Sequence, residues 1–195
     1  MKRLGDRALL VRRPSELRGD LQCTLASIPH AVDYVLSEEH IAVYFNRVPD
    51  VSEEHILRAL SAQTMPRAQK TTHTLRVRYT GPDLAAVAEQ VGLTEAGIVA
   101  LHCGALYEVA FLGFMPGFAY LRGLPSQLVL PRRSTPRERV AAGSVAIGGT
   151  YTGVYPFASP GGWHLLGELI SPPLFDAELG PLLQAGDEIR FVPEL

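Results

Sequence analysis

Arginine gathers in one short stretch of the chain, next to two prolines. Arg132, Arg133 and Arg137 lie around Pro131 and Pro136 in the segment LPRRSTPRERV. A planar guanidinium can bind a carboxylate or a phosphate through two parallel hydrogen bonds, and proline fixes φ, so rigid turns would aim these groups. The pattern predicts a site for an anionic ligand, and a solvated or partner-facing basic loop is the alternative.

Aromatic residues and glycines crowd the same part of the chain, between residues 111 and 164. Rigid loops that carry rings and guanidinium groups can hold a planar or anionic ligand. Glycine and proline also turn the corners of a barrel of short strands, so Tyr155 and Trp163 could either stack on a ligand or fill the barrel mouth. The candidate substrate- or nucleotide-binding residues are Phe114, Pro116, Gly117, Tyr120, Arg132, Arg133, Arg137, Ser144, Tyr155, Gly161, Gly162 and Trp163.

Two histidines are weak candidates for catalysis, and no other catalytic residue is assigned. The imidazole of His164, which follows Trp163, could act as an acid, as a base or as a hydrogen-bond donor to phosphate. The alternative is that it faces solvent or a partner. His102 closes a predicted helix, where a cation suits the dipole's negative end; we expect a structural role, with lining of the site as the alternative. The histidines show neither HxH nor HExxH, so no metal site is predicted.

Missing motifs exclude other chemistries. The sequence has no GxxxxGK[ST], which excludes a P-loop, and no GxSxG nucleophile elbow; neither Ser144 nor Ser159 has the context of a hydrolase nucleophile. Cys23 and Cys103 make no CxxC pair, so neither a disulfide framework nor a zinc knuckle is indicated. We expect each cysteine to be a small buried residue or a bystander.

Composition predicts a soluble protein with one or two compact domains. The chain has 195 residues, of which 47% are hydrophobic, and its net charge of −2 gives no global attraction to nucleic acid or to an anionic membrane. No apolar run reaches the roughly 18 residues of a membrane span, and the N-terminal segment lacks the apolar core of a signal peptide. We therefore expect a cytoplasmic protein.

A polar segment between Ser61 and Thr74 marks a domain boundary. Before it, ALLVRR and HIAVYF read as strands, and PSELRGDLQCTLASI and VSEEHILRALSA have helical spacing, so residues 1–72 are predicted to form a small α+β domain. Residues 73–195 form the second predicted domain.

The second domain is predicted to be a β-barrel with two helices at its entry. GPDLAAVAEQVGL and TEAGIVALHCG read as short helices, the latter with Thr94 as its N-cap. From Tyr107 onward, short strands alternate with Gly/Pro turns, and only PLFDAELGPLL could be a longer helix.

Three sequence blocks carry a resemblance to a known family. LGFMPGFAYLRGLP, PRRSTPRERVAAGSVAIGG and TGVYPFASPGGWHLLG occur in this order between Arg76 and Pro193. They resemble the signature blocks of the allophanate hydrolase subunit 1 family, which includes the B subunit of bacterial 5-oxoprolinase as well as a sporulation-kinase inhibitor. The resemblance implies a cyclophilin-like β-barrel after an N-terminal domain of ferredoxin-like character. The predicted fold class is therefore α+β.

The same resemblance implies an activity. It is that of a subunit of a 5-oxoprolinase-type amidohydrolase, in which ATP hydrolysis drives opening of 5-oxo-L-proline to L-glutamate. The implied cofactor is ATP, and the implied partners are homologues of the enzyme's C subunit, from the allophanate hydrolase subunit 2 family, and of its A subunit. With no evident base in this chain, we expect it to be inactive alone. The alternatives are a non-enzymatic inhibitor of a sensor histidine kinase and a subunit for allophanate- or urea-type amide hydrolysis.

Three places depart from the family's usual pattern, and one of them is Thr150-Tyr151-Thr152, where Asn-Gln-Thr is common. Ala141 stands where proline is usual, which should loosen that turn. Glu168 stands where arginine is usual, so an anion site or a contact between subunits that depends on arginine would change.

Overall fold

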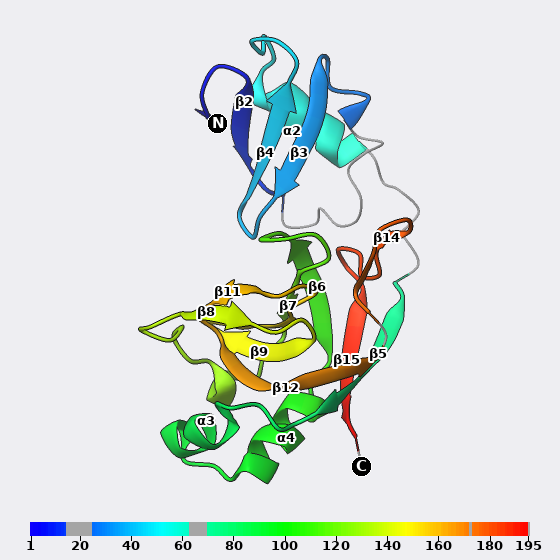
Figure 1. Ribbon diagram of the computed structural model, residues 1–195. Helices are drawn as coiled ribbons and strands as arrows, with labels where there is room; N and C mark the ends of the chain where they lie inside the picture. Colours follow the sequence, from blue (N-terminus) through cyan, green and yellow to red (C-terminus); the bar gives the residue numbers. More distant parts are fainter. Residues whose placement is uncertain (15–24, 63–69, 172, 195) are drawn as a thin grey trace. The chain divides into compact units, whose positions relative to one another are not determined.

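The computed structural model describes residues 1–14, 25–62, 70–171 and 173–194. The chain divides into two compact units, residues 1–70 and residues 71–195, each with its own hydrophobic core (Figure 1). The predicted helix over PSELRGDLQCTLASI and the expectation for Cys23 fall largely or wholly outside the described residues.

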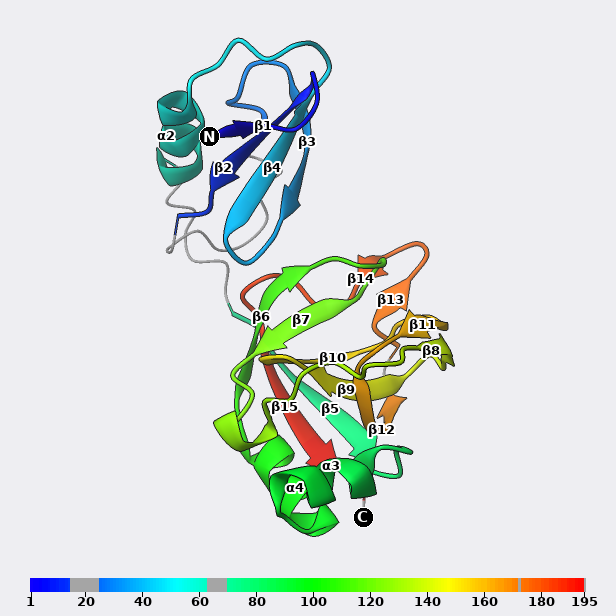
Figure 2. The ribbon, with the colours of Figure 1, turned by 90° about the vertical axis from the view of Figure 1, so that its left-hand side faces the viewer.

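The first unit is a small antiparallel sheet packed against a helix. Its four strands are ordered β1-β2-β4-β3, and helix α2 contributes Ile56 and Leu60 to the same core as Leu9, Val11 and Ile41 (Figure 2). The elements are β1 (Lys2–Arg3), β2 (Ala8–Arg12), β3 (Ala31–Leu36), β4 (His40–Phe45) and α2 (Glu53–Ala62). This is an α+β arrangement, and its ferredoxin-like character stays a prediction.

The second unit is a closed barrel of seven strands, which fits a cyclophilin-like architecture. Its strands are ordered β10-β7-β6-β15-β5-β12-β9, and β9 pairs with β10 to close the circle. All neighbours in the barrel are antiparallel except β15 and β5, which run parallel. The strands are β5 (Thr72–Arg78), β6 (Tyr107–Leu112), β7 (Ala119–Arg122), β9 (Ser144–Gly148), β10 (Tyr151–Val154), β12 (His164–Ser171) and β15 (Glu188–Pro193).

Two helices lie side by side at one end of the barrel, as the sequence predicted (Figures 1 and 2). Helix α3 (Leu84–Val91) buries Leu84, Val87 and Ala88, and helix α4 (Glu95–Gly104) begins at the Thr94 cap, whose hydroxyl accepts a 3.0 Å hydrogen bond from the Gly97 amide. The apolar residues at helical spacing and the N-cap explain why these segments are helical. The predictions of both helices and of the cap are confirmed.

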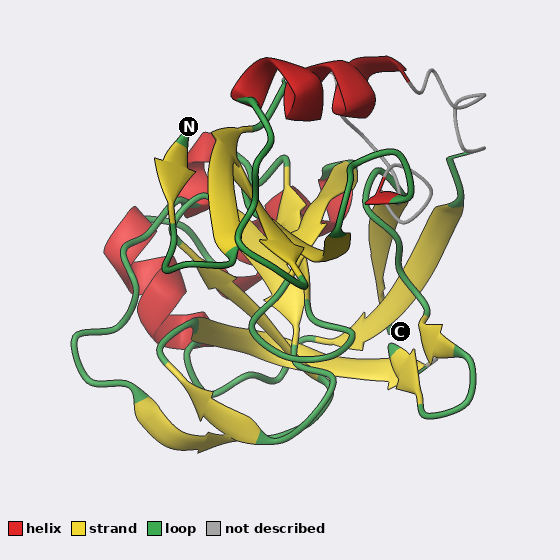
Figure 3. Ribbon diagram, turned by 90° about the horizontal axis from the view of Figure 1, so that it is seen from above, coloured by secondary structure: helices red, strands yellow, loops and turns green. Residues whose placement is uncertain are grey.

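Short elements join the barrel strands; Figure 3 distinguishes helices, strands and loops by colour. They are the 3₁₀ turn η1 (Ser126–Leu128), the pair β8 (Arg137–Val140) and β11 (Ser159–Gly161), and the hairpin β13 (Phe175–Asp176) and β14 (Gly180–Pro181). The helix considered for PLFDAELGPLL is wrong: the Asp176 carboxylate accepts hydrogen bonds from the Glu178 and Leu179 amides and fixes a turn instead.

Within the described ranges, no single helix is long and apolar enough to cross a membrane; α3 and α4 together meet that criterion only by length and composition, with a 90° bend between them. The described residues also contain no group of three His, Cys, Asp or Glu side chains placed to hold a metal ion.

Candidate ligand-binding site

The predicted aromatic residues meet in one cluster in the barrel wall. The Phe118 ring lies edge-on to Tyr120, Tyr155 and Trp163, with centroid separations of 5.0, 5.4 and 5.5 Å. Trp163 and Tyr155 are 4% and 2% exposed and pack in a buried cluster with Val140, Ala146 and Leu165, so their rings do not present an open stacking face. Tyr120 is only partly buried. It is the member of this cluster that reaches the surface beside residues 131–137, which we call the arginine loop.

Phe114 extends this cluster into solvent. Its ring is 59% exposed and touches Phe118 and Tyr155 edge-on, and its backbone has a φ of 68°, in the left-handed region. A bulky residue in that region costs of order 1–3 kcal/mol unless its surroundings hold it there. Exposed Pro116 and buried Gly117 follow it, and Gly117 has a φ of 77°. This turn therefore holds an aromatic ring at the surface.

Two of the three predicted site arginines are bound to one buried carboxylate. Arg137 donates from both terminal nitrogens to the two oxygens of Asp83, at 2.9 and 2.8 Å, and Arg133 donates from Nη1 at 2.9 Å. The second Asp83 oxygen also accepts the Leu165 amide at 2.7 Å. The guanidinium groups do bind a carboxylate, but one from the same chain.

Asp83 stays ionised because its partners outweigh its burial. Burial alone would raise its pKa, but the hydrogen bonds from Arg137 and the Leu165 amide, with the charges of Arg137 and Arg133, hold the pKa below its usual value. Sequence reasoning missed this residue. The available signal was an acidic side chain at the Gly-Pro-Asp entry to a helix, but a contact with arginines 50 and 54 residues away leaves no local pattern.

Arg132 differs from its neighbours because no carboxylate in the described part of the chain pairs with it, and it is exposed. Its backbone is fixed on both sides. The Pro131 carbonyl contacts the His164 Nε2 at 2.9 Å, and the Arg133 amide donates to the Gly162 carbonyl at 2.7 Å. Predicted site residues Gly162 and His164 therefore hold the loop in place, and a catalytic role for His164 stays a prediction.

Two more predicted residues act through packing. A Cβ at Gly161 would come within 2.9 Å of the Tyr155 Cζ, so only glycine lets β11 pass this ring. Ser144 is 7% exposed, and its carbonyl accepts the Tyr155 amide, which makes it part of the barrel wall.

His102 belongs to a different, buried network. Its Nε2 contacts the Thr152 hydroxyl at 2.8 Å, and its Nδ1 contacts the Tyr79 hydroxyl at 2.7 Å. The Thr152 hydroxyl donates its hydrogen to the Ala146 carbonyl, so Thr152 must accept a hydrogen bond from His102 Nε2–H. The unprotonated His102 Nδ1 then accepts from the Tyr79 hydroxyl. The Cys103 thiol donates in turn to Tyr79. Burial lowers the pKa of His102 to about 3, so the expected cation at the helix end is wrong and the side chain is a neutral structural group.

Glu168 forms an ion pair within the barrel. It lies directly across from Arg78 in the pairing of β12 with β5, and its carboxylate accepts a 2.6 Å hydrogen bond from Arg78 Nη1. Arg78 also donates from Nε to Glu194 at 2.6 Å. The acidic residue at this position therefore has its cationic partner on the neighbouring strand.

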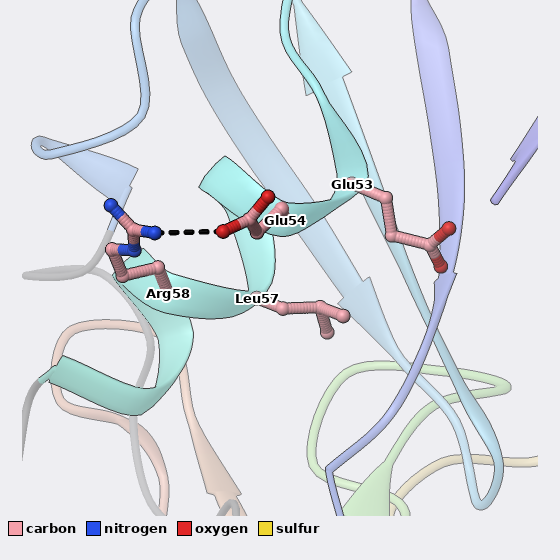
Figure 4. Close-up of a pocket in the computed structure, with 4 residues that line it drawn as sticks. All are labelled: Glu53, Glu54, Leu57 and Arg58. Carbon is pink, nitrogen blue, oxygen red and sulfur yellow. Dashed lines mark hydrogen bonds and ion pairs between the residues drawn. The ribbon is translucent and has the colours of Figure 1, made fainter.

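A shallow pocket on the first unit contains none of these residues. It is lined by Glu53, Glu54, Leu57 and Arg58 of α2 (Figure 4). Glu54 pairs with Arg58 at 2.7 Å, and Glu53 pairs with the Met1 amino group at 2.7 Å. Its charged groups are thus already paired, and we place the candidate site on the barrel.

The barrel, its signature loops and the match over residues 1–182 define the class: the chain belongs to the family described as the carboxyltransferase domain, subdomain C and D. The resemblance to the family that contains the B subunit of 5-oxoprolinase is confirmed by its relatives. The chain is 58% identical to that subunit from Escherichia coli O157:H7 over 116 residues, which are 58% of this chain and 53% of that protein. The chain thus spans about half the length of the curated relatives that it matches.

Solved structures resemble almost the whole chain. The uncharacterized protein PH0987 from Pyrococcus horikoshii is 31% identical with a TM-score of 0.61, and the match covers 99% of this chain and 96% of that one. The protein TTHA0988 is 33% identical with a TM-score of 0.79, but the match covers 97% of this chain and only 40% of that one. The same fold therefore occurs both by itself and as a part of a longer chain.

Proposed function

We propose that this chain is a subunit of a 5-oxoprolinase-type amidohydrolase, which opens the lactam of 5-oxo-L-proline to L-glutamate at the cost of ATP. The observation that carries the proposal is the 58% identity to the B subunit of a 5-oxoprolinase. That match covers 116 residues, which are 58% of this chain. A cytoplasmic location and a ferredoxin-like first unit belong to the same proposal.

The contacts of the predicted arginines bear on where a nucleotide could bind. Arg133 and Arg137, which the sequence offered for phosphate, donate to Asp83. A triphosphate needs several cationic or backbone donors around it. We therefore propose that ATP binds outside this chain or where a partner completes the site, and we derive no step of the reaction through it.

The need for a partner follows from the same reasoning. A base and a phosphate site are both needed for the reaction, and the residues that the structure describes provide neither in an evident form. We propose that a homologue of the C subunit shares an interface with this chain, and that a homologue of the A subunit completes the reaction. The 40% coverage of TTHA0988 supports a partner, because a closely similar unit exists there beside other protein in one chain.

Co-expression tests the proposal. The chain is produced with the C-subunit homologue, the complex is isolated by size exclusion, and ATP hydrolysis dependent on 5-oxoproline is measured with and without the A-subunit homologue. We expect turnover only when this chain is present and none from the chain alone. Turnover of urea or allophanate in place of 5-oxoproline would move the assignment to the other amide hydrolases, and inhibition of a histidine kinase without any turnover would make the chain a regulator.

A further inference from the structure

The arginine loop carries more positive charge than its carboxylate partner Asp83 neutralises. Arg133 and Arg137 share the single negative charge of Asp83, and Arg137 engages it with both terminal nitrogens. Arg132 has no carboxylate partner in the parts of the chain that the structure describes. One guanidinium therefore remains available at the surface.

The surroundings of Arg132 bring it to the surface edge of the aromatic cluster. Its two neighbours are tied to Gly162 and His164, which flank buried Trp163. The Trp163 ring lies 5.7 Å from the Tyr120 ring. The positive charge of Arg132 also acts on the Tyr120 and Tyr155 hydroxyls, where it opposes the rise in pKa that burial causes.

Tyr120 supplies a neutral donor at this point. The ring is held by a stacked contact with Phe111 at 4.4 Å and by the edge of Phe118 at 5.0 Å. Its hydroxyl hydrogen-bonds to no described residue, although the ring around it is half buried. Phe114 projects an exposed ring from the same cluster through its contact with Phe118.

We propose that Arg132 and Tyr120 form a site for a single small carboxylate, with the exposed Phe114 ring against the apolar part of the same ligand. One guanidinium fork and one hydroxyl match the two oxygens of a carboxylate. Asp83 acts as a positioning residue, since it holds Arg133 and Arg137 away from the ligand and restricts the site to one negative charge. The site discriminates against polyphosphates for the same reason.

The choice of probe rests on the proposed function: L-5-oxoproline has the required carboxylate, and 2-pyrrolidinone is the same ring without it. Binding of both is measured by calorimetry to the full chain and to its complex with the C-subunit homologue. The variants are Arg132→Gln and Tyr120→Phe, and Arg139→Gln is the control because Arg139 is an exposed arginine of the adjacent strand β8.

We expect L-5-oxoproline to bind at least about tenfold more tightly than 2-pyrrolidinone, since a hydrogen-bonded charge contributes that much or more. Arg132→Gln should reduce the affinity for L-5-oxoproline to that for 2-pyrrolidinone and leave the latter unchanged. Tyr120→Phe should weaken L-5-oxoproline binding by about fivefold, as for one neutral hydrogen bond. Arg139→Gln should change neither.

The inference would be overturned by equal losses for both ligands in Arg132→Gln, by equal losses in Arg139→Gln, or by no carboxylate binding by the chain or the complex at millimolar concentration. If Arg132→Gln breaks the complex and leaves ligand binding intact, the carboxylate belongs to the partner and the small-ligand site is wrong. The two proposals fail separately: turnover without selective binding at Arg132 contradicts this site alone, and selective binding without turnover contradicts the proposed enzyme alone.

Discussion

At the scale of single residues, Asp83 joins the start of α3, the arginine loop and β12. A buried carboxylate that accepts from two arginines and a backbone amide is costly to neutralise, because both guanidinium groups then lose their counter-charge. Asp83→Asn should lower the free energy of unfolding by about 3 kcal/mol, at the low end of the range for broken buried pairs, since Arg133 and Arg137 are partly exposed. Urea denaturation measures this value.

The control for that prediction is Glu89→Gln, an exposed acidic position on the same helix. It should change the free energy of unfolding by no more than about 0.5 kcal/mol, as is usual for surface substitutions. Equal losses in the two variants would show that the effect comes from helix charge and not from the Asp83 contacts.

His102 makes a separate prediction about pH. Its pKa is lowered from 6.5 to about 3 in the folded protein, so between these values the unfolded chain holds a proton that the folded chain lacks. The contribution of neutral His102 to stability is complete above pH 6.5 and decreases as the pH falls toward 3, by at most roughly 1.4 kcal/mol per pH unit. Measurement of the free energy of unfolding across this acidic range should show this slope.

The variant His102→Gln should have a flatter pH dependence over that range. A glutamine can donate to Thr152 and accept from Tyr79, which keeps the network without a group that titrates. Parallel slopes in the wild type and the variant would contradict the assignment, because other groups would then carry the pH dependence. The Asp83 pKa is also lowered, but its effect appears only as the pH falls below the ordinary value of 3.8.

At the scale of elements, the short strand β11 depends on a glycine at one position. In Gly161→Ala the new methyl group would meet the Tyr155 ring, which is packed against Phe118. We expect a loss of about 1–3 kcal/mol, as for other overpacked cores. In the matched control, Gly162→Ala, the nearest atom to the new methyl is Pro136 Cγ at an ordinary 3.6 Å, so thermal denaturation should show a much smaller change.

Local signals predicted α3 and α4, because helical spacing and the Thr94 cap act within a few residues. The same reasoning failed for PLFDAELGPLL, where Phe175 packs on Phe157 and against Gly117 and thereby stabilises a hairpin. Local sequence signals were also insufficient for the candidate site. Sequence drew attention to the arginine-rich loop, but the pairing of Asp83 with Arg133 and Arg137 depends on tertiary contacts and changes which arginine is available.

At the scale of the whole molecule, each unit has a core of its own. The second unit contains a closed barrel with buried clusters centred on Tyr107 and Phe191, on Val87 and Ile98, and on Phe118 and Trp163. We expect residues 71–195 to fold without residues 1–70. A dispersed NMR spectrum and a single cooperative urea transition would confirm this, and a collapsed fragment without a transition would contradict it.

The parallel pair of β15 and β5 has a consequence for synthesis. β15 lies between β5 and β6, with Glu188 opposite Thr72 and Pro193 opposite Val77. The first and last strands of the barrel are thus neighbours, and the ribosome must extend the chain through Pro193 before the circle can close. Until then β5 and β6 each lack one neighbour, and we expect these open edges to leave the nascent barrel prone to pairing with other chains.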